Sequence, residues 1–348
     1  MPRASMLSEV LRRRFDPALE AVMRKLSRHD VRGPLRAALA LHRNKAMRRT
    51  IERFAPAVAP LEHAVLQGDG AAIERFDTLV AEAVTAMRAE RPRDLDGDGG
   101  SRLTELLHAV DARLYRDRPE LMDDPSFPED ERTHALDVLD RFNHCTGIYE
   151  TVKAAIDPLV EAASAGGKRP IVHDVAAGHG GLSLYLAERF GERVAIEASD
   201  LREEYLALGR AQAAERGLSV RFSVEDALAL GGLEERGVDV ITCTQAIHHF
   251  PPGMIARMMG EAARRARVGA CFIDGERSYT SLGLVALVGA LYGRTYTFYY
   301  DAVTSIRRMF YEEELALVAA LAPGMPKVRV ETGIAPPSHV YVRITRES

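Results

Sequence analysis

From residue 170 onward, short apolar and β-branched runs alternate with longer amphipathic runs, and this alternation restricts the fold more than any other feature. Runs typical of buried strands occupy residues 171–175, 193–196, 220–224, 238–243 and 270–273. Helical patterns, in which apolar residues recur every three or four positions, fill the intervals at 182–190, 203–216 and 254–266. Strand–helix–strand repeats of this length form right-handed crossovers and a parallel sheet. After a further helical run, two late runs at 328–332 and 339–344 complete the sheet edge.

The first half of the chain lacks strand patterns. Helical periodicity covers residues 7–26, 35–51, 73–87, 103–114 and 135–162, with turn-forming residues at 33–34, 56–60 and 91–100. The character changes at Ala165-Gly-Gly-Lys. We therefore expect an all-α N-terminal domain over residues 1–165. Residues 166–348 are expected to form a seven-stranded, mostly parallel sheet with helices on both faces.

Composition places the protein among ordinary globular chains. Its 348 residues suit two domains, and 47% of them are hydrophobic. The three cysteines, Cys145, Cys243 and Cys271, are isolated, so neither a disulfide framework nor a thiolate zinc site is expected. No apolar run approaches the roughly 18 residues of a membrane span, and the first residues lack a signal-peptide core. We expect a cytoplasmic protein without a membrane partner, and the oligomeric state stays open, a homodimer included.

The small net charge of −4 conceals an asymmetry. Residues 1–60 contain 14 Lys and Arg against 5 Asp and Glu, whereas residues 61–140 contain 9 against 20. A basic segment can bind nucleic acid or a membrane. Here the basic residues interleave with apolar ones at helical spacing, which favours a solvated helix face. Docking of the basic helices on the acidic segment is a second structural interpretation.

The break near residue 95 has the spacing of a calcium loop. Asp94, Asp96, Asp98 and Gly99 are followed by Glu105, and carboxylate oxygens are ligands that Ca²⁺ prefers. Pro92 and the polar Ser101 depart from the pattern, and no second loop pairs with this one. An acidic turn that caps the next helix explains the same residues, so the sequence predicts no metal site.

The turn after the first strand carries a glycine motif. It has the sequence His173-Asp-Val-Ala-Ala-Gly-His-Gly-Gly-Leu-Ser. Glycine lets backbone turn tightly and approach a ligand, and this turn is the usual cofactor platform of an open parallel sheet. The spacing differs from the GxGxxG of dinucleotide enzymes, since Ser183 stands three positions after Gly180. There is also no P-loop lysine.

Asp174-Val-Ala-Ala-Gly178-His-Gly180 resembles the first motif of class I S-adenosylmethionine (SAM) dependent methyltransferases, in which an acid precedes glycines at four and six positions. Ala176 stands where the family often has a further glycine. Further matches follow in order, and together they cover about residues 168–275. The resemblance implies a Rossmann-like SAM-binding domain.

The resemblance also implies roles for individual residues. The glycine turn, with Asp174, Ala176, Gly178 and Gly180, wraps the methionine and ribose of SAM. Asp200, followed by Leu201, is the acid that grips the ribose hydroxyls, and Glu197 is a rival for that role. The adenine is received by Glu225, Asp226 and Ala227. The segment from Thr242 through Gln245 to His249 lies along the methionine moiety and opens toward substrate.

Candidates for the catalytic residue are His248 and His249, at the end of the fourth strand. SAM is already activated by its sulfonium, so alignment of the reactants and exclusion of water supply much of the catalysis. Histidine titrates near neutral pH and can serve as a base. A packing role for the pair is the alternative. His179 could touch the cofactor carboxylate or stabilise its own turn.

The resemblance implies that the helical domain over residues 1–165 covers the site and selects the acceptor. The substrate side of the site is expected to include the end of this domain. Asn143 and Tyr149 lie in a polar, aromatic stretch, and an aromatic face stabilises a sulfonium by cation–π attraction. Burial of Tyr149 between helices is the alternative. Arg277 and Tyr299, in the aromatic-rich region after the fifth strand, are further candidates. Arg277 and Arg307-Arg308 could bind a carboxylate, or pair with Glu276, Glu312 and Glu313.

Three functions follow from these patterns. The first is methyl transfer to a small-molecule acceptor, in the manner of biosynthetic and secondary-metabolite enzymes. Nucleic acid is disfavoured as acceptor, because Gln245-Ala-Ile-His replaces the Asn/Asp-Pro-Pro-Tyr/Phe of base methylases. The second is a SAM-using cyclase that releases methylthioadenosine, for example while forming azetidine-2-carboxylate. The third is a non-catalytic SAM-fold subunit, which the retained motif acids and glycines oppose.

Overall fold

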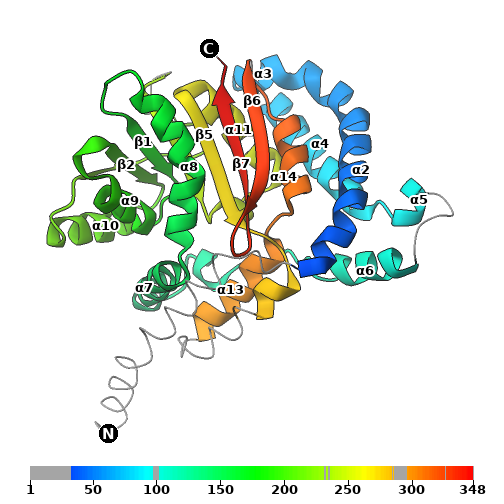
Figure 1. Ribbon diagram of the computed structural model, residues 1–348, viewed down its shortest axis with the longest axis horizontal. Helices are drawn as coiled ribbons and strands as arrows, with labels where there is room; N and C mark the ends of the chain where they lie inside the picture. The colour runs from blue at the N-terminus through cyan, green and yellow to red at the C-terminus, as the bar shows by residue number, and fades with distance from the viewer. Residues whose placement is uncertain are drawn as a thin grey trace, which may run out of the picture.

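The computed structural model describes residues 33–96, 102–230, 233, 236–283, 285, 296–325 and 327–347. Its centre is a seven-stranded sheet in the order β3-β2-β1-β4-β5-β7-β6 (Figure 1). The strands are β1 (Ile171–Val175), β2 (Ala195–Asp200), β3 (Val220–Val224), β4 (Val238–Thr244), β5 (Ala266–Gly275), β6 (Val328–Ala335) and β7 (His339–Arg346). All pairs are parallel except those that β7 makes with β5 and β6. The predicted fold class is confirmed.

Helices cover both faces of the sheet. Along the chain they are α2 (Gly33–Val58), α3 (Glu62–Leu66), α4 (Gly70–Ala89), α5 (Pro92–Asp96), α6 (Arg102–Ala112), α7 (Glu129–Thr146), α8 (Ile148–Ser164), α9 (Gly181–Phe190), α10 (Glu203–Glu215), α11 (Pro252–Arg265), α13 (Tyr296–Arg308) and α14 (Glu312–Ala320). One face carries α8, α9 and α10, and the other carries α11 and α14. The sequence run predicted for 7–26 lies outside the described residues.

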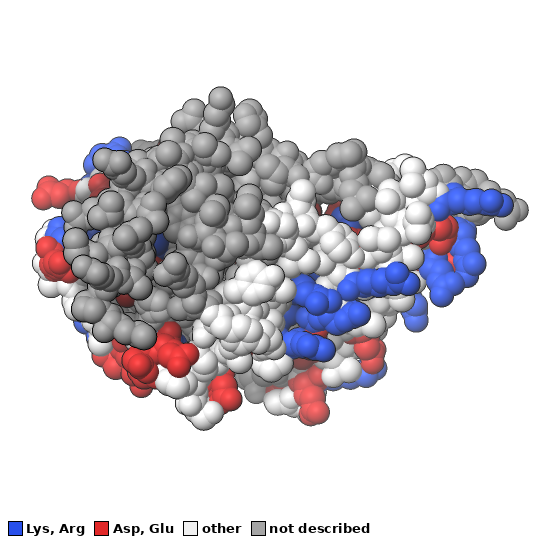
Figure 2. Space-filling model, turned by 90° about the horizontal axis from the view of Figure 1, so that it is seen from below, with Lys and Arg blue, Asp and Glu red and all other residues white. Residues whose placement is uncertain are grey.

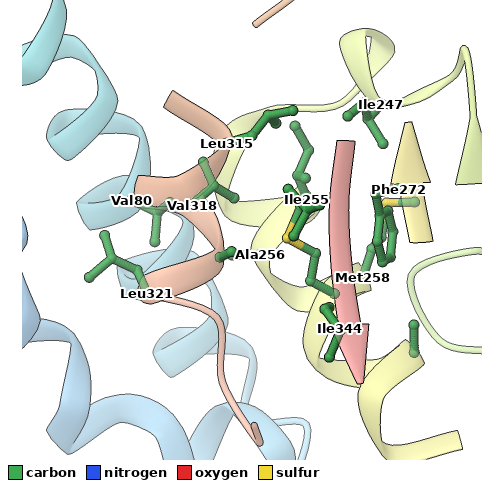
Figure 3. Packing of buried hydrophobic residues seen from close by; sticks show 14 of the residues in the cluster. Val80, Ile247, Ile255, Ala256, Met258, Phe272, Leu315, Val318, Leu321 and Ile344 are labelled. Atoms are coloured by element: carbon green, nitrogen blue, oxygen red, sulfur yellow. The ribbon is translucent and has the colours of Figure 1, made fainter. Parts of the chain in front are cut away.

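The helical first half shares a core with the sheet. α4 packs on α11, and α2 packs on α14, so one apolar cluster reaches from α2 to β7. Figure 3 shows Val80 of α4 facing Val318 of α14 and Leu321, which directly follows that helix, next to Ala256 of α11. Covered on both sides, α14 buries most of its residues, whereas α11 keeps a polar face with Arg257, Glu261 and Arg265.

The single helical run predicted for 135–162 is two helices. Gly147 ends α7 in the left-handed region, with φ of 72°, and α8 starts at the next residue. A glycine adopts this conformation at little cost, so the chain can turn there. α8 then packs on β4 and β5 of the sheet (Figure 1). The domain boundary at residue 165 stays a prediction, although α8, which precedes it, covers the sheet.

Charge pairing supports docking between the basic and acidic segments. Arg43 of α2 lies 2.7 Å from Asp111, and Arg49 lies 2.7 Å from Glu90. Seen from below, the described residues carry groups of both signs on one face (Figure 2). Within the described ranges, no helix combines the length and apolarity needed to cross a bilayer.

The calcium-like spacing is only partly described, since residues 97–101 lie outside the described part. Asp94 belongs to helix α5 rather than to a loop. The Glu105 carboxylate accepts a 2.7 Å hydrogen bond from the backbone N–H of Arg93. This contact joins α6 to the first turn of α5, and capping of α6 by the acidic turn stays a prediction.

The contact between α4 and α11 yields a prediction about stability. A Cβ at Gly253 of α11 would collide with the backbone of Asp77 in α4, whereas a Cβ at Gly70 meets open space. We expect Gly253→Ala to lower the free energy of unfolding by about 1–3 kcal/mol, because the two helices must separate. Denaturant unfolding followed by circular dichroism measures it. Gly70→Ala is the control, and equal losses in the two variants would contradict the docking.

Candidate active site

The glycine turn links β1 to α9 in a conformation that few side chains allow. Ala176, Gly178 and Gly180 all have positive φ, at 53°, 58° and 79°. A Cβ at Gly180 would lie 2.7 Å from the ring of Phe222, so the close approach requires glycine as well. Ala176, where the resembling family often has glycine, adopts its left-handed φ at a cost of roughly 1–2 kcal/mol.

Asp200 braces this turn from the neighbouring strand. Its Oδ2 accepts a 2.9 Å hydrogen bond from the backbone N–H of Gly178, and its Oδ1 accepts one of 2.9 Å from Arg202. β2 was expected to end at residue 196 but extends to Asp200. The acid therefore stands at the carboxyl end of the strand, beside the turn. Glu197, the rival, contacts His173 at 3.2 Å and Arg221 at 3.3 Å instead.

A cavity of about 550 Å³ opens at the carboxyl ends of β1, β2 and β4. Many of the residues that the sequence singled out line it. They are Asn143, Tyr149, Asp174, Ala176, Gly178, Asp200, Leu201, Gln245, His248 and His249. The turn after β1, the end of β2, the loop after β4 and the helical half thus meet around one space.

Other predicted residues lie outside that lining. Gly180 is part of the turn, and Glu225, Asp226 and Ala227 follow β3. The Asp226 carboxylate accepts a 2.9 Å hydrogen bond from the backbone N–H of Leu228, and Ala227 is buried in the core. Tyr299 is 42% exposed and lines a separate pocket with Arg116 and Tyr300.

Arg277 is not at the cavity. It is buried, 2.6 Å from Glu314, which also pairs with Arg88 at 2.7 Å. Burial would raise the pKa of Glu314, but the two guanidinium groups hold it well below its usual range. The ion pair agrees with the alternative that Arg277 pairs with an acid of the protein and not with a substrate carboxylate. Its partner is Glu314, whereas the sequence pointed to Glu276, Glu312 and Glu313. Arg308 likewise pairs with acids, at 3.4 Å from Asp123.

Helices α7 and α8 close one side of the cavity with polar groups. The Asn143 amide donates to Oε1 of Gln245 at 2.8 Å, and the Tyr149 hydroxyl donates to Asp140 at 2.7 Å. Within the described residues, Asn143 Oδ1 and His179 Nε2 are buried and make no hydrogen bond. Both residues line the cavity.

The opposite end of the cavity holds the histidine pair in η5 (Ile247–His249). His248 Nδ1 lies 2.8 Å from Asp274 at the end of β5, and its Nε2 lies 3.4 Å from Glu120. Burial would lower the pKa of His248, but the two carboxylates outweigh it and raise the pKa to about 10. His249 lies 3.4 Å from Asp123 and 3.9 Å from Glu120.

The sequence missed the acidic groups around this pair. Glu120 caps η3 (Leu121–Asp123) from the irregular segment before α7, and no local motif marks it. Asp301 and Ser305 come from α13, about 180 residues later. Asp301 accepts hydrogen bonds from the backbone N–H groups of Leu121, at 2.6 Å, and Met122, at 3.2 Å. Only contacts between distant segments reveal that these residues belong to the site.

Asp174, under the glycine turn, is fully buried. Burial raises the pKa of its carboxyl to about 7, while a 2.7 Å hydrogen bond from the hydroxyl of Ser183 opposes the shift and nearby Asp200 adds to it. A carboxyl buried in this way is half protonated near neutral pH.

Comparison with known proteins supports the motif assignment. Residues 172–269 match the model of a family described as a methyltransferase domain. No curated protein matches the chain significantly. The match confirms the resemblance carried by the motifs between Asp174 and Asp274.

Similar solved structures include the plantazolicin methyltransferase BamL, at 15% identity and a TM-score of 0.47, covering 64% of this chain and 92% of that one. The magnesium protoporphyrin IX methyltransferase ChlM from Synechocystis PCC 6803 has 17% identity and a TM-score of 0.39, covering 68% of this chain and 92% of that one.

Asp174 generates a pH prediction. Its folded pKa lies above the unfolded value of about 3.8, so the folded state holds the proton more tightly. The stability that this proton provides is present below pH ~4 and is lost as the pH rises to about 7. Asn cannot ionise, so Asp174→Asn should gain stability over the natural protein by about 2 kcal/mol more at pH 8 than at pH 5.5. Urea unfolding at both pH values tests this, and a pH-independent difference would contradict the assignment.

Proposed function

We propose that this chain, which belongs to the class I SAM-dependent methyltransferase superfamily, transfers a methyl group from SAM to a small-molecule acceptor. The observation that carries the proposal is the cavity itself. It extends from the glycine turn braced by Asp200 to buried His248 and partly exposed His249. One end thus offers a cofactor platform and the other a partly enclosed, mostly apolar space for an acceptor.

The cofactor half of the cavity has groups suited to each part of SAM. Asp200 retains acceptor capacity beside its two backbone contacts, so its carboxylate can bind ribose hydroxyls. Leu201, which is 64% exposed, offers an apolar surface to adenine. The turn atoms around Ala176 and Gly178, together with Gln245, would contact the methionine part. Glu225, Asp226 and Ala227, after β3, are assigned to the adenine edge by the family resemblance.

The acceptor half is apolar with polar groups at its rim. Leu136, Leu139, Phe142, Phe298 and Ile306 supply the apolar wall. Asn143 and Tyr149 border both halves, and Tyr149 would place its ring near the sulfonium. His248 and His249, in η5 after β4, border the far end of the acceptor half and are proposed to orient the acceptor. A mostly apolar pocket with few fixed polar groups suits a small organic molecule.

Three wider assignments accompany this proposal. The acceptor belongs to a biosynthetic pathway, and nucleic acid is not the substrate. The protein acts in the cytoplasm, in keeping with three free cysteines. It functions as a monomer or homodimer.

Incubation with SAM alone separates methyl transfer from cyclisation. We expect no methylthioadenosine without an acceptor, and S-adenosylhomocysteine only when a panel of phenols, carboxylic acids and amines is added. Methylthioadenosine from SAM alone would instead establish cyclisation. Absence of SAM binding in calorimetry would overturn both functions and leave a non-catalytic role.

Asp200→Asn tests the cofactor site. Loss of a charged hydrogen-bond acceptor costs about 1.5–3 kcal/mol, so the Kd for SAM should rise by about 10- to 150-fold in calorimetry. Glu203→Gln is the matched control, because Glu203 begins the next helix and pairs only with exposed Arg210 in the described structure. Unchanged affinity in Asp200→Asn would transfer the ribose role to another acid.

A further inference from the structure

Three side chains with metal-binding atoms converge at the acceptor end of the cavity. Glu120, His248 and His249 each offer one such atom, and these atoms all lie within 4.8 Å of one another. The side chains of Glu120 and His248 are each 4% exposed, and that of His249 is 33% exposed. The group is therefore shielded from bulk water on one side and open to the cavity on the other.

The geometry at His248 calls for a positive species between it and Glu120. Its Nδ1 lies 2.8 Å from an Asp274 carboxylate oxygen, so Nδ1 carries the proton and donates. When the remaining Nε2 carries no proton, its lone pair points toward Glu120 Oε1, 3.4 Å away. Two buried lone pairs that face each other repel, so a cation or a proton between them stabilises the pair.

His249 repeats the arrangement. Its Nδ1 lies 3.4 Å from Asp123, and its Nε2 lies 3.9 Å from the second oxygen of Glu120. A carboxylate behind the other ring nitrogen is the usual support of a metal-bound histidine, since it fixes the tautomer and the ring orientation. Both histidines of this cluster have that support.

The residues around Glu120 hold its side chain in place, and most of the charged ones are acidic. Ser305 donates a 2.6 Å hydrogen bond to Glu120 Oε1, and Asp301 binds the backbone that follows Glu120. The acids Glu120, Asp123 and Asp301 line this space and Asp274 lies behind His248, whereas Arg308 supplies one positive charge, 3.4 Å from Asp123. Such an excess of negative charge favours a bound divalent cation.

We propose that Glu120, His248 and His249 bind one divalent transition-metal ion with the ligand preferences of Zn²⁺. Ligand atoms about 2.0–2.2 Å from zinc lie roughly 3.0–3.5 Å apart. The 3.4 Å from His248 Nε2 to Glu120 Oε1 already meets this value. His249 Nε2 lies 3.9 Å from the other oxygen, Oε2, so both carboxylate oxygens would hold the ion after a shift of about half an ångström. Two histidines and one carboxylate leave further coordination positions open, as in catalytic sites. This proposal replaces the sequence-based expectation of no metal.

The role of the ion rests on the proposed function. Its open positions face the cavity, where they would bind a hydroxyl oxygen of the acceptor. A metal ion lowers the pKa of a bound hydroxyl. The hydroxyl proton leaves to water, the oxygen lone pair forms the bond to the methyl carbon, and the electrons of the breaking C–S bond stay on sulfur. The substrate class is therefore a hydroxylated acceptor.

Metal binding is tested without any turnover. The full chain is dialysed against a chelator and titrated with Zn²⁺ in calorimetry, and with Co²⁺ while its visible d–d absorption is recorded. We expect one equivalent of either ion. Glu120→Gln and His249→Ala should each weaken Zn²⁺ binding at least about tenfold and remove the Co²⁺ band.

Exposed residues of the same types provide the controls. Glu131→Gln on α7 and His63→Ala on α3 should bind Zn²⁺ like the natural protein. Circular dichroism monitors folding, and the partly exposed His249 keeps the test available if Glu120→Gln does not fold. The proposal is overturned if the natural chain binds no stoichiometric ion, or if neither site variant changes the affinity. In that case a proton occupies the space between His248 and Glu120.

Failure of this proposal is distinguishable from failure of the proposed function. Methyl transfer by chelator-treated protein at full rate would overturn the metal role and leave the function intact. Stoichiometric Zn²⁺ binding by a chain that does not bind SAM would do the reverse.

Discussion

The position of β1 between β2 and β4 constrains the rest of the site. The chain leaves β1 toward β2 on one side, and reaches β4 on the other side only after β3, so the connections diverge around the end of β1. A crevice forms where connections diverge in this way, at the carboxyl ends of the strands. The glycine turn, Asp200 and the loop with His248 all border it because each follows one of these three strands.

The helical half has two separate physical tasks. α2 and α4 cover α11 and α14, which makes them part of the core behind the sheet. α7 and η3 instead border the cavity, where Asn143 contacts Gln245 and Glu120 faces His248. The first task stabilises the fold, and the second decides which groups an acceptor meets. A cap that was only peripheral would leave α11 and α14 exposed to water.

Much of the cofactor side could be predicted from the sequence, because its residues are neighbours of strand ends. Asp174, Gly178 and Asp200 each occupy a fixed offset from an apolar strand run, and the carboxyl ends of parallel strands share one edge. The exact strand bounds were harder to predict. β2 continues to Asp200, but the polar residues near its end hide this from the apolar pattern of the sequence. The turn at Gly147 was also missed, because the apolar periodicity continues on both sides of it.

The acceptor side could not be predicted in the same way. Glu120 has no motif around it, and it meets His248 only because Asp301 and Ser305 of α13 hold its segment in place. Arg277 has the residue type of a carboxylate-binding group, but a buried contact with Glu314, 37 residues away, occupies it. Long-range contacts of this kind depend on how helices pack, and packing depends on shape as well as on hydrophobic pattern.

By itself, the sequence determined the parallel sheet, the glycine turn and the order of the strand-end acids. These are consequences of local periodicity and of the handedness of crossovers, which act within a few tens of residues. Only the tertiary structure decided which polar groups of the helical half and of α13 face the histidine pair. That outcome follows from burial, since desolvated carboxylates and imidazoles must find partners wherever the fold brings them together.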